Sequence, residues 1–256
     1  MLETITLRSG DVEAEVVPAR GAIVSALRVD GRDVLYMDRA TLEDPAKNVR
    51  GGIPVLFPFA GKLAGETFAL TGTVMKQHGF GRNRAWPVAG QGASWVRMTL
   101  AADDDTRAQY PYAFAAEQTV MIVPGGLHVE LQITAGDADL PVSPGWHPYF
   151  CVAAADKGAV RGDVDGFTPD RIGDDREFDF GVVAPTSGRA EFDVPGLGTV
   201  HLAFSPVMRH LQFWSQPGKP FICLEPFHGP AGTVNSDRRA WVPAHQARTY
   251  WMRITL

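Results

Sequence analysis

Alternation of apolar and polar residues with period two is the feature that most restricts how this chain can fold. In LHVELQIT, residues 127–134, every second residue is apolar. The same alternation recurs in residues 11–17, 95–100 and 250–256, and in the shorter segments 199–204 and 211–214. Successive side chains of a β-strand point to opposite faces, so each segment is predicted to be a strand with one buried face.

Glycine and proline divide the chain into short pieces, with 27 and 19 residues respectively. Residues 38–48, DRATLEDPAKN, hold one or two helical turns at most, because Pro45 prevents a long helix. Residues 101–111 and 162–175 are predicted to be acidic loops. Many short strands and few short helices favour an all-β fold, a large antiparallel β-sandwich. Without a repeat or linker, residues 1–256 are predicted to be a single domain.

Composition excludes several classes of protein. A chain of 256 residues with 45% hydrophobic residues is long enough to bury a sizeable core. It has no apolar run of 18 residues, so no membrane span is expected, and its start lacks the pattern of a signal peptide. We therefore expect a cytoplasmic protein. The net charge of −5 argues against a nucleic-acid partner.

Two cysteines, Cys151 and Cys223, are too few and too widely spaced for a disulfide framework or a cysteine metal site. Both are expected to be reduced. Most of the 24 basic side chains are arginines, whose forked guanidinium suits bidentate contacts to carboxylates, phosphates or neighbouring hydroxyls.

Three titratable residues lie in apolar or conformationally restricted segments. His78 lies in QHGFGRNRAW, where the flanking glycines are expected to leave space beside its ring, although a lone histidine is more often a structural residue. His147 lies among aromatic residues in GWHPYF, which would lower its pKa. Glu225 follows the apolar run FICL and is predicted to end a buried strand. A buried carboxylate must be paired, protonated or functional.

A fourth segment, NVRGGIPVLFPFAGKL, places Arg50 before two glycines. Gly51 and Gly52 allow positive φ and a close approach of neighbouring backbone. Two interpretations of Arg50 stay open. It either caps carbonyl groups of a buried loop or belongs to a binding pocket.

Two other kinds of site are weighed against an acid/base pair. His78, His147 and Glu225 could form a two-histidine, one-carboxylate metal site, but no HxH or HExxH spacing supports it, so no metal is expected. A serine hydrolase would need a motif such as GxSxG, which is missing. What remains is an imidazole and a carboxylate in an aromatic-lined pocket with arginine nearby, which suits a sugar ring and its hydroxyls.

The segments RGGIPVLFPFAG, QHGFGR, GWHPYF and LEPF, in this order over residues 50–226, resemble the aldose 1-epimerase (mutarotase) family, including its hexose-6-phosphate mutarotase branch. The resemblance implies a galactose mutarotase-like supersandwich. It also implies an isomerase that interconverts the α and β anomers of aldoses, with no cofactor.

The resemblance implies roles for individual residues. Glu225 falls on the general base and His147 on the general acid, while His78 falls on a first histidine that contacts the sugar near the reacting centre. Pocket-lining positions on the sugar or phosphate side match Arg50, Gln77 and Arg82. The best match to a substrate-binding aspartate is Asp179, with Asp163 and Asp165 as alternatives.

The implied mechanism is acid/base ring opening. Glu225 takes the proton of the C1 hydroxyl and His147 protonates the ring oxygen. The C1–C2 bond of the open aldehyde then turns and the ring closes on the other face. The alternatives are a non-catalytic carbohydrate-binding or sensory protein on the same sandwich, or a polysaccharide lyase or hydrolase. The expected partner is a small sugar or sugar phosphate. Its epimer and the oligomeric state stay open, and negative charge with few lysines slightly favours a free aldose.

Overall fold

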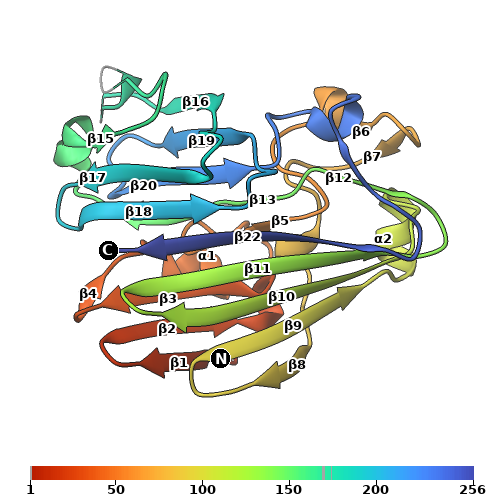
Figure 1. Ribbon diagram of the computed structural model, residues 1–256, viewed down its shortest axis with the longest axis horizontal. Coiled ribbons are helices and arrows are strands. Elements are labelled where there is room, and N and C mark those ends of the chain that lie inside the picture. Colours follow the sequence, from red (N-terminus) through yellow and green to blue (C-terminus); the bar gives the residue numbers. More distant parts are fainter. Residues whose placement is uncertain (1, 169–170, 174) are drawn as a thin grey trace.

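The computed structural model describes residues 2–168, 171–173 and 175–256 of the chain. In this part of the chain, most secondary structure is antiparallel β-sheet, which confirms the predicted all-β class. Long strands cross the middle of the molecule, with further sheets above and below them in the view of Figure 1. The predicted strands correspond to seven observed ones, β2, β9, β11, β18, β19, β20 and β22.

The largest sheet has eight strands. In spatial order they are β15 (Arg161–Gly162), β17 (Arg189–Val194), β18 (Gly198–Phe204), β22 (Ala247–Thr255), β11 (Gly126–Ala135), β10 (Phe114–Val123), β9 (Trp95–Ala101) and β8 (Val88–Gln91). The C-terminal strand β22 pairs with β11 on one side and with β18 on the other, as Figure 1 shows. The last strand of the chain therefore joins two groups of strands that are remote in sequence.

A six-stranded sheet carries most of the polar residues discussed below. Its order is β16 (Phe178–Val183), β19 (His210–Ser215), β20 (Phe221–Phe227), β13 (Gly145–Trp146) and β5 (Val55–Leu56), with β14 (Tyr149–Cys151) also paired to β20. Glu225 was predicted to end its strand, and this is wrong. The strand β20 continues through Pro226 to Phe227, so the carboxylate lies within the sheet.

A four-stranded sheet formed by the N-terminal segment packs next to strands β10 and β11. It contains β1 (Ile5–Ser9), β2 (Val12–Val17), β3 (Ile23–Val29) and β4 (Arg32–Asp33). Two small ribbons complete the sheets, β12 (Leu140–Val142) with β21 (Ala240–Val242) and β6 (Thr67–Phe68) with β7 (Thr73–Val74).

Helical structure in the described residues is limited to short segments. The α-helices are α1 (Arg39–Glu43) and α2 (Asp104–Gln109), and 3₁₀ turns occur at Pro18–Arg20, Ala64–Glu66, Gly81–Asn83, Ala154–Ala159 and Thr233–Asn235. None of these helices is long and apolar enough to span a membrane.

Residues 101–111 were predicted to be a loop, and this is wrong. They contain α2, whose first turn is stabilised by a capping box between Asp103 and Thr106. Two carboxylates in the first turn, Asp104 and Asp105, add favourable interactions with the helix dipole. The other predicted loop, 162–175, lacks long regular elements where it is described, and residues 169, 170 and 174 of it lie outside the described part.

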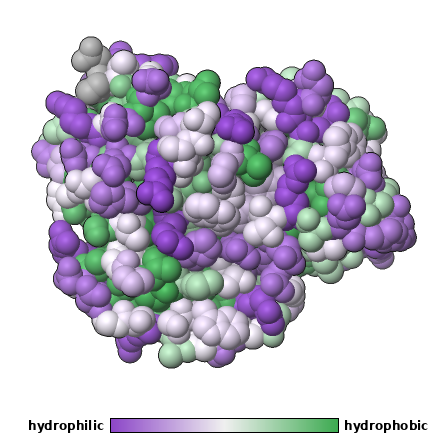
Figure 2. Space-filling view, viewed as in Figure 1, coloured by the Kyte–Doolittle hydropathy of each residue, from purple (hydrophilic) through white to green (hydrophobic). Residues whose placement is uncertain are grey.

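One continuous apolar core includes residues from all three larger sheets. The predicted alternation is confirmed in β11, where Leu127, Val129, Leu131 and Ile133 are each at most 1% exposed. Polar and apolar side chains are interspersed on the surface seen in Figure 2. Burial of one face of each long strand therefore holds the sheets together and fixes the register of their pairing.

Candidate active site

A cleft of about 450 Å³ opens on one face of the six-stranded sheet. Its volume lies within the range of ligand-binding pockets. All seven residues predicted to form a site line it, and the seven are Arg50, Gln77, His78, Arg82, His147, Asp179 and Glu225. The segments that carry them are up to about 175 residues apart, so only the fold brings them together.

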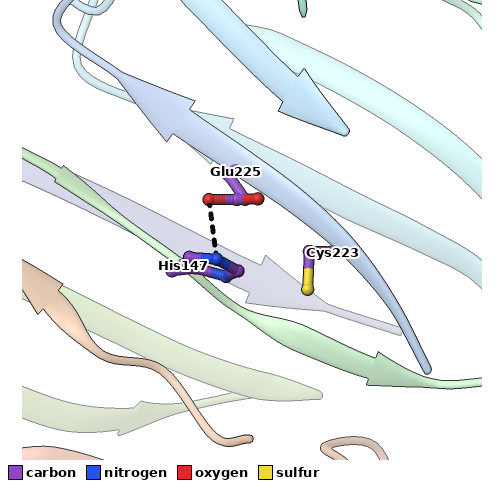
Figure 3. A group of neighbouring side chains, drawn as sticks. All are labelled: His147, Cys223 and Glu225. Carbon is purple, nitrogen blue, oxygen red and sulfur yellow. Dashed lines mark ion pairs between the residues drawn. The ribbon is translucent and has the colours of Figure 1, made fainter. Parts of the chain in front are cut away.

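His147 and Glu225 form a buried pair. His147 lies between β13 and β14, and its backbone N–H donates to the carbonyl of Pro54. Its Nε2 lies 3.4 Å from Oε2 of Glu225, and the two side chains are shown facing each other in Figure 3. The imidazole stacks on Tyr149, with ring centroids 4.6 Å apart, and Trp214 meets it edge-on. Aromatic packing therefore fixes the ring at hydrogen-bonding range of the carboxyl group.

Burial changes the protonation of both members of this pair. It raises the pKa of Glu225 well above the ordinary value, with the nearby Asp179 adding to the rise and Arg82 opposing it. It also lowers the pKa of His147 well below the ordinary value, and Arg82 and Arg50 lower it further. The low dielectric disfavours the charged form of each group. Between the lowered pKa of His147 and the raised pKa of Glu225, the pair therefore holds one proton.

His78 is fixed by two hydrogen bonds with Gly61. The backbone N–H of His78 donates to the Gly61 carbonyl over 2.9 Å, and the Gly61 N–H donates to Nδ1 of His78 over 3.0 Å. Since Nδ1 accepts, the proton of the neutral ring is on Nε2. Burial, followed by Arg82, lowers the pKa of His78 well below its ordinary value. His78 is therefore a neutral hydrogen-bond donor.

The glycine next to His78 does not leave open space, contrary to the expectation from sequence. A Cβ on Gly79 would lie within 2.6 Å of Cδ of Pro58, and Gly79 has a positive φ of 63°. The space is filled by the neighbouring chain. Gly52 behaves as predicted, since its φ is also 63° and an added Cβ would overlap the Val24 carbonyl.

Two arginines bring positive charge to the cleft. Arg50 is exposed and lies over the ring of Trp214, with its Cζ 5.2 Å from the ring centroid. Arg82 is half-buried, and its Nη2 donates to the Gln77 carbonyl over 3.1 Å. Its Nε has no hydrogen-bond partner among the described residues, and burial lowers its pKa to about 10. Lys62 is a third cation of the cleft. The forked guanidinium groups of Arg50 and Arg82 suit a phosphate or vicinal hydroxyls.

Of the three candidate aspartates, only Asp179 lines the cleft. It lies on β16, and Nε2 of Gln212 donates to its Oδ1. Asp163 and Asp165 line a separate cavity, together with residues 181–183 of β16. The geometry thus favours Asp179 over both alternatives.

Several polar residues of the cleft were missed by sequence reasoning. They are Asn48, Lys62, Glu177, Gln212, Trp214 and Gln216. Gln212 and Trp214 lie in LQFW, which was interpreted only as a strand, although a glutamine on an otherwise buried strand is an available signal. Trp214 donates from Nε1 to Oε1 of Glu177 over 2.7 Å. This bond fixes the indole on which Arg50 lies.

The two-histidine, one-carboxylate set weighed as an alternative is not the group that the fold assembles in the described residues. His147, Cys223 and Glu225 instead present ligand atoms within 4.8 Å of one another (Figure 3). A thiol must lose its proton to bind a metal. Burial raises the pKa of Cys223 well above its ordinary value, with Glu225 raising it further. This chemistry does not favour a metal.

Removal of metals is therefore expected to leave activity unchanged. The measurement is the initial rate before and after dialysis against EDTA, with metal content determined on both samples. A loss of rate that is restored by zinc or manganese, but not by buffer, would contradict this expectation and indicate a metal at His147, Cys223 and Glu225.

A larger cavity of about 760 Å³ adjoins the same sheet, lined in part by Gly181, Val183 and His210. Among the described residues that line it there is no carboxylate, and its exposed wall is mainly apolar although three arginines, Arg209, Arg238 and Arg248, contribute to it. It lacks an acid/base pair, so the smaller and more polar cleft is the candidate active site.

Comparison with known proteins identifies the family of this chain. The model of the family described as "Aldose 1-epimerase" matches residues 3–238. The chain belongs to the aldose 1-epimerase family. The curated "Putative glucose-6-phosphate 1-epimerase" of Cenchrus ciliaris is 26% identical over 175 residues, which cover 63% of this chain. The match spans 50% of the length of that relative.

Solved structures of similar proteins confirm the predicted galactose mutarotase-like fold. The Slr1438 protein from Synechocystis sp. PCC 6803 is 29% identical, with a TM-score of 0.91 over 100% of this chain and 96% of that one. A galactose mutarotase related enzyme from Lactobacillus acidophilus is 16% identical, with a TM-score of 0.81 over 99% and 97% of the two chains. The family and the fold predicted from four short segments are thus both confirmed.

Proposed function

We propose that this protein is a mutarotase that interconverts the α and β anomers of an aldose. The observation that carries the proposal is the buried His147–Glu225 pair, with Nε2 and Oε2 3.4 Å apart, on the wall of a polar cleft. Ring opening needs one group to accept the C1 hydroxyl proton and another to protonate the ring oxygen. An imidazole and a carboxyl that share one proton supply both functions.

The reactive form of the pair has Glu225 ionised and His147 protonated. It has the same number of protons as the more stable form, in which burial leaves both groups neutral. Transfer of one proton converts one form to the other. Arg82 favours the ionised glutamate. Both Arg82 and Arg50 disfavour the imidazolium of His147. In the proposed cycle Glu225 is the base and His147 the acid in ring opening, and the roles reverse in closure. The neutral His78 donates a hydrogen bond from Nε2 to the sugar.

His147→Asn is expected to remove the alkaline limb of the rate profile. In the wild type, activity falls at high pH when the pair loses its last proton, and at low pH when it gains a second one. The raised pKa of Glu225 places the alkaline limb above the ordinary range of a glutamate. In the mutant, Glu225 acts only as a base, so the residual rate should rise with pH through that same pKa.

The measurement is kcat/KM from pH 4 to pH 10 for both proteins, corrected for spontaneous mutarotation. His128→Asn is the matched control, because His128 lies on β11 outside the cleft. If the alkaline limb persists in His147→Asn, His147 is not the general acid, and His78 becomes the candidate for that role.

For the substrate, we propose a hexose 6-phosphate. Arg50, Lys62 and Arg82 line one cleft, and a phosphate dianion bound near them would offset the charges that lower the pKa of His147. The substrate would thereby favour the imidazolium that the reaction needs. The name of the Cenchrus ciliaris relative supports the same substrate class. This proposal departs from the slight preference for a free aldose that net charge suggested.

Polarimetry of freshly dissolved α-glucose, α-galactose and glucose 6-phosphate, with and without the protein, tests both parts of the proposal. Catalysis of glucose 6-phosphate in preference to the free sugars is expected. Equal or higher rates with a free sugar would overturn the choice of substrate. Binding of a sugar without any acceleration would support the alternative, a non-catalytic carbohydrate-binding protein.

A further inference from the structure

A series of hydrogen bonds runs along the sheet beside the acid/base pair. His210 Nε2 and Gln212 Oε1 are 2.7 Å apart on β19, and Gln212 Nε2 donates to Oδ1 of Asp179 on β16. In the register of the sheet, Gln212 is opposite Glu225 on one side and Gly181 on the other. His210, Gln212 and Asp179 therefore form one connected group next to the proposed base.

The direction of each hydrogen bond in this group is determined by its neighbour. A carboxylate only accepts hydrogen bonds, so the Gln212 amide must turn its nitrogen toward Asp179. Its oxygen then faces His210, which must carry a proton on Nε2 in order to donate. Each side chain has a single orientation that satisfies its partners.

Gly181 makes room for this arrangement. A Cβ at this position would overlap Cε1 and Nε2 of His210 and would lie 2.7 Å from Oε1 of Gln212. Gly181 has no positive φ, so the requirement here is for space and not for backbone conformation. Any other residue at position 181 would displace the ring that donates to Gln212.

His210 does not line the cleft and so is placed to act through Gln212. It lines the adjacent apolar cavity, and its ring stacks on Phe227, with centroids 5.9 Å apart. Burial lowers its pKa, while Gln212 and Asp179 oppose the shift. The His210 ring thus packs against Phe227 on one side and close to the backbone of Gly181, which has no side chain, on the other.

We propose that His210, packed against Gly181, is a positioning residue that anchors the oxygen of the Gln212 amide and thereby holds Asp179 in place to accept a sugar hydroxyl. The inference deepens the proposed mutarotase function and rests on it. With no donor at position 210, the Gln212 oxygen loses its partner, and the amide is held only through its nitrogen by Asp179. Asp179 then loses its fixed orientation, and a ring hydroxyl of the sugar loses its acceptor.

The kinetic test uses His210→Met, which keeps bulk but removes the donor. We expect kcat/KM to fall about threefold to tenfold, as for loss of one neutral hydrogen bond, mainly through a higher KM. Gly181→Ala should have the same effect, and His210→Gln, which can donate from a similar position, should restore most of the loss. Val183→Ala, two residues along β16, is the matched control. In an Asp179→Asn background, His210→Met should add little, because the two act as one unit.

A spectroscopic test does not depend on catalysis. The ¹⁵N shifts of the His210 ring should show the neutral Nε2–H tautomer in the wild type, and Gln212→Met should abolish that preference. An Nδ1–H tautomer in the wild type, or unchanged kcat/KM in a folded His210→Met protein, would overturn the inference. A wild type that catalyses no mutarotation would instead overturn the proposed function, and the ring shifts would still decide whether the hydrogen-bonded group exists.

Discussion

Glu225→Gln is expected to reduce mutarotation by at least about 100-fold while the protein stays folded, because a general base contributes on this scale. Glu225 is 1% exposed, and its Oε2 lies 3.4 Å from Nε2 of His147. Glutamine has the same shape as the protonated glutamate but cannot take a proton from the C1 hydroxyl. The measurement is kcat by polarimetry, with near-UV circular dichroism to verify the fold.

Stability provides an independent control for this substitution. Since the pKa of Glu225 is raised in the folded state, that state holds the proton more tightly than the unfolded chain does. Wild-type stability therefore decreases as pH rises from the ordinary pKa of glutamate toward the raised one. Glutamine carries no such proton, so Glu225→Gln should not show this decrease. If the mutant retains wild-type rates, the acid/base roles proposed for the pair are wrong.

Arg82→Ala is expected to lower kcat/KM for glucose 6-phosphate about ten- to a hundredfold and to change the rate for free glucose little. A charge-assisted hydrogen bond is worth roughly 1.5–3 kcal/mol, which corresponds to this range. Arg82 has an unpartnered Nε among the described residues and lines the cleft with Arg50. The measurement is kcat/KM for both sugars in both proteins.

Two variants separate charge from geometry in this test. Arg82→Lys keeps the charge but loses the fork, so it should recover only part of the preference for the phosphate. Arg107→Ala removes a charge from α2, outside the cleft, and should leave both rates unchanged. Equal losses for both sugars in Arg82→Ala would show that Arg82 binds hydroxyls or supports the cleft, and would contradict the phosphate role. A mutant that loses only free-glucose activity would contradict that role as well.

Local patterns predicted the strands well because the alternation of apolar and polar residues within each half-buried strand shows which face is buried. Residues 127–134 alternate strictly. They lie in β11, and the four apolar residues predicted to be buried are in the core. The helix α2 was missed because its capping interactions are specific to Asp103 and Thr106, while the acidic composition of the segment resembles a loop. The end of β20 was misplaced because the apolar run stops at Leu224, whereas the strand pairing continues, with Glu225 opposite Gln212 and Pro226 opposite Leu211 of β19.

The candidate site was predictable in part for a different reason. His147 and Glu225 lie in segments whose apolar neighbours make a titratable group costly, so the segments themselves signal a special role. Gln212 and His210 carry no such local signal, since a glutamine or histidine on a strand is unremarkable until its partners are known. Their partners on β16, Asp179 and Gly181, are about 30 residues away in sequence.

The class of fold, the family and the residue types available for chemistry could be predicted from local patterns, because strand periodicity and short motifs are local properties of the chain. Which of these residues meet depends on the folding of the whole chain. The tertiary structure paired Nε2 of His147 with Glu225, placed Asp179 and not Asp163 in the cleft, and placed Gly181 where a Cβ would block the ring of His210. The pKa shifts of the pair are likewise tertiary, since they arise from burial and from arginines on other segments. The physical reason is that desolvation, packing and hydrogen-bond direction depend on strand register and on long-range contacts, which no local pattern specifies.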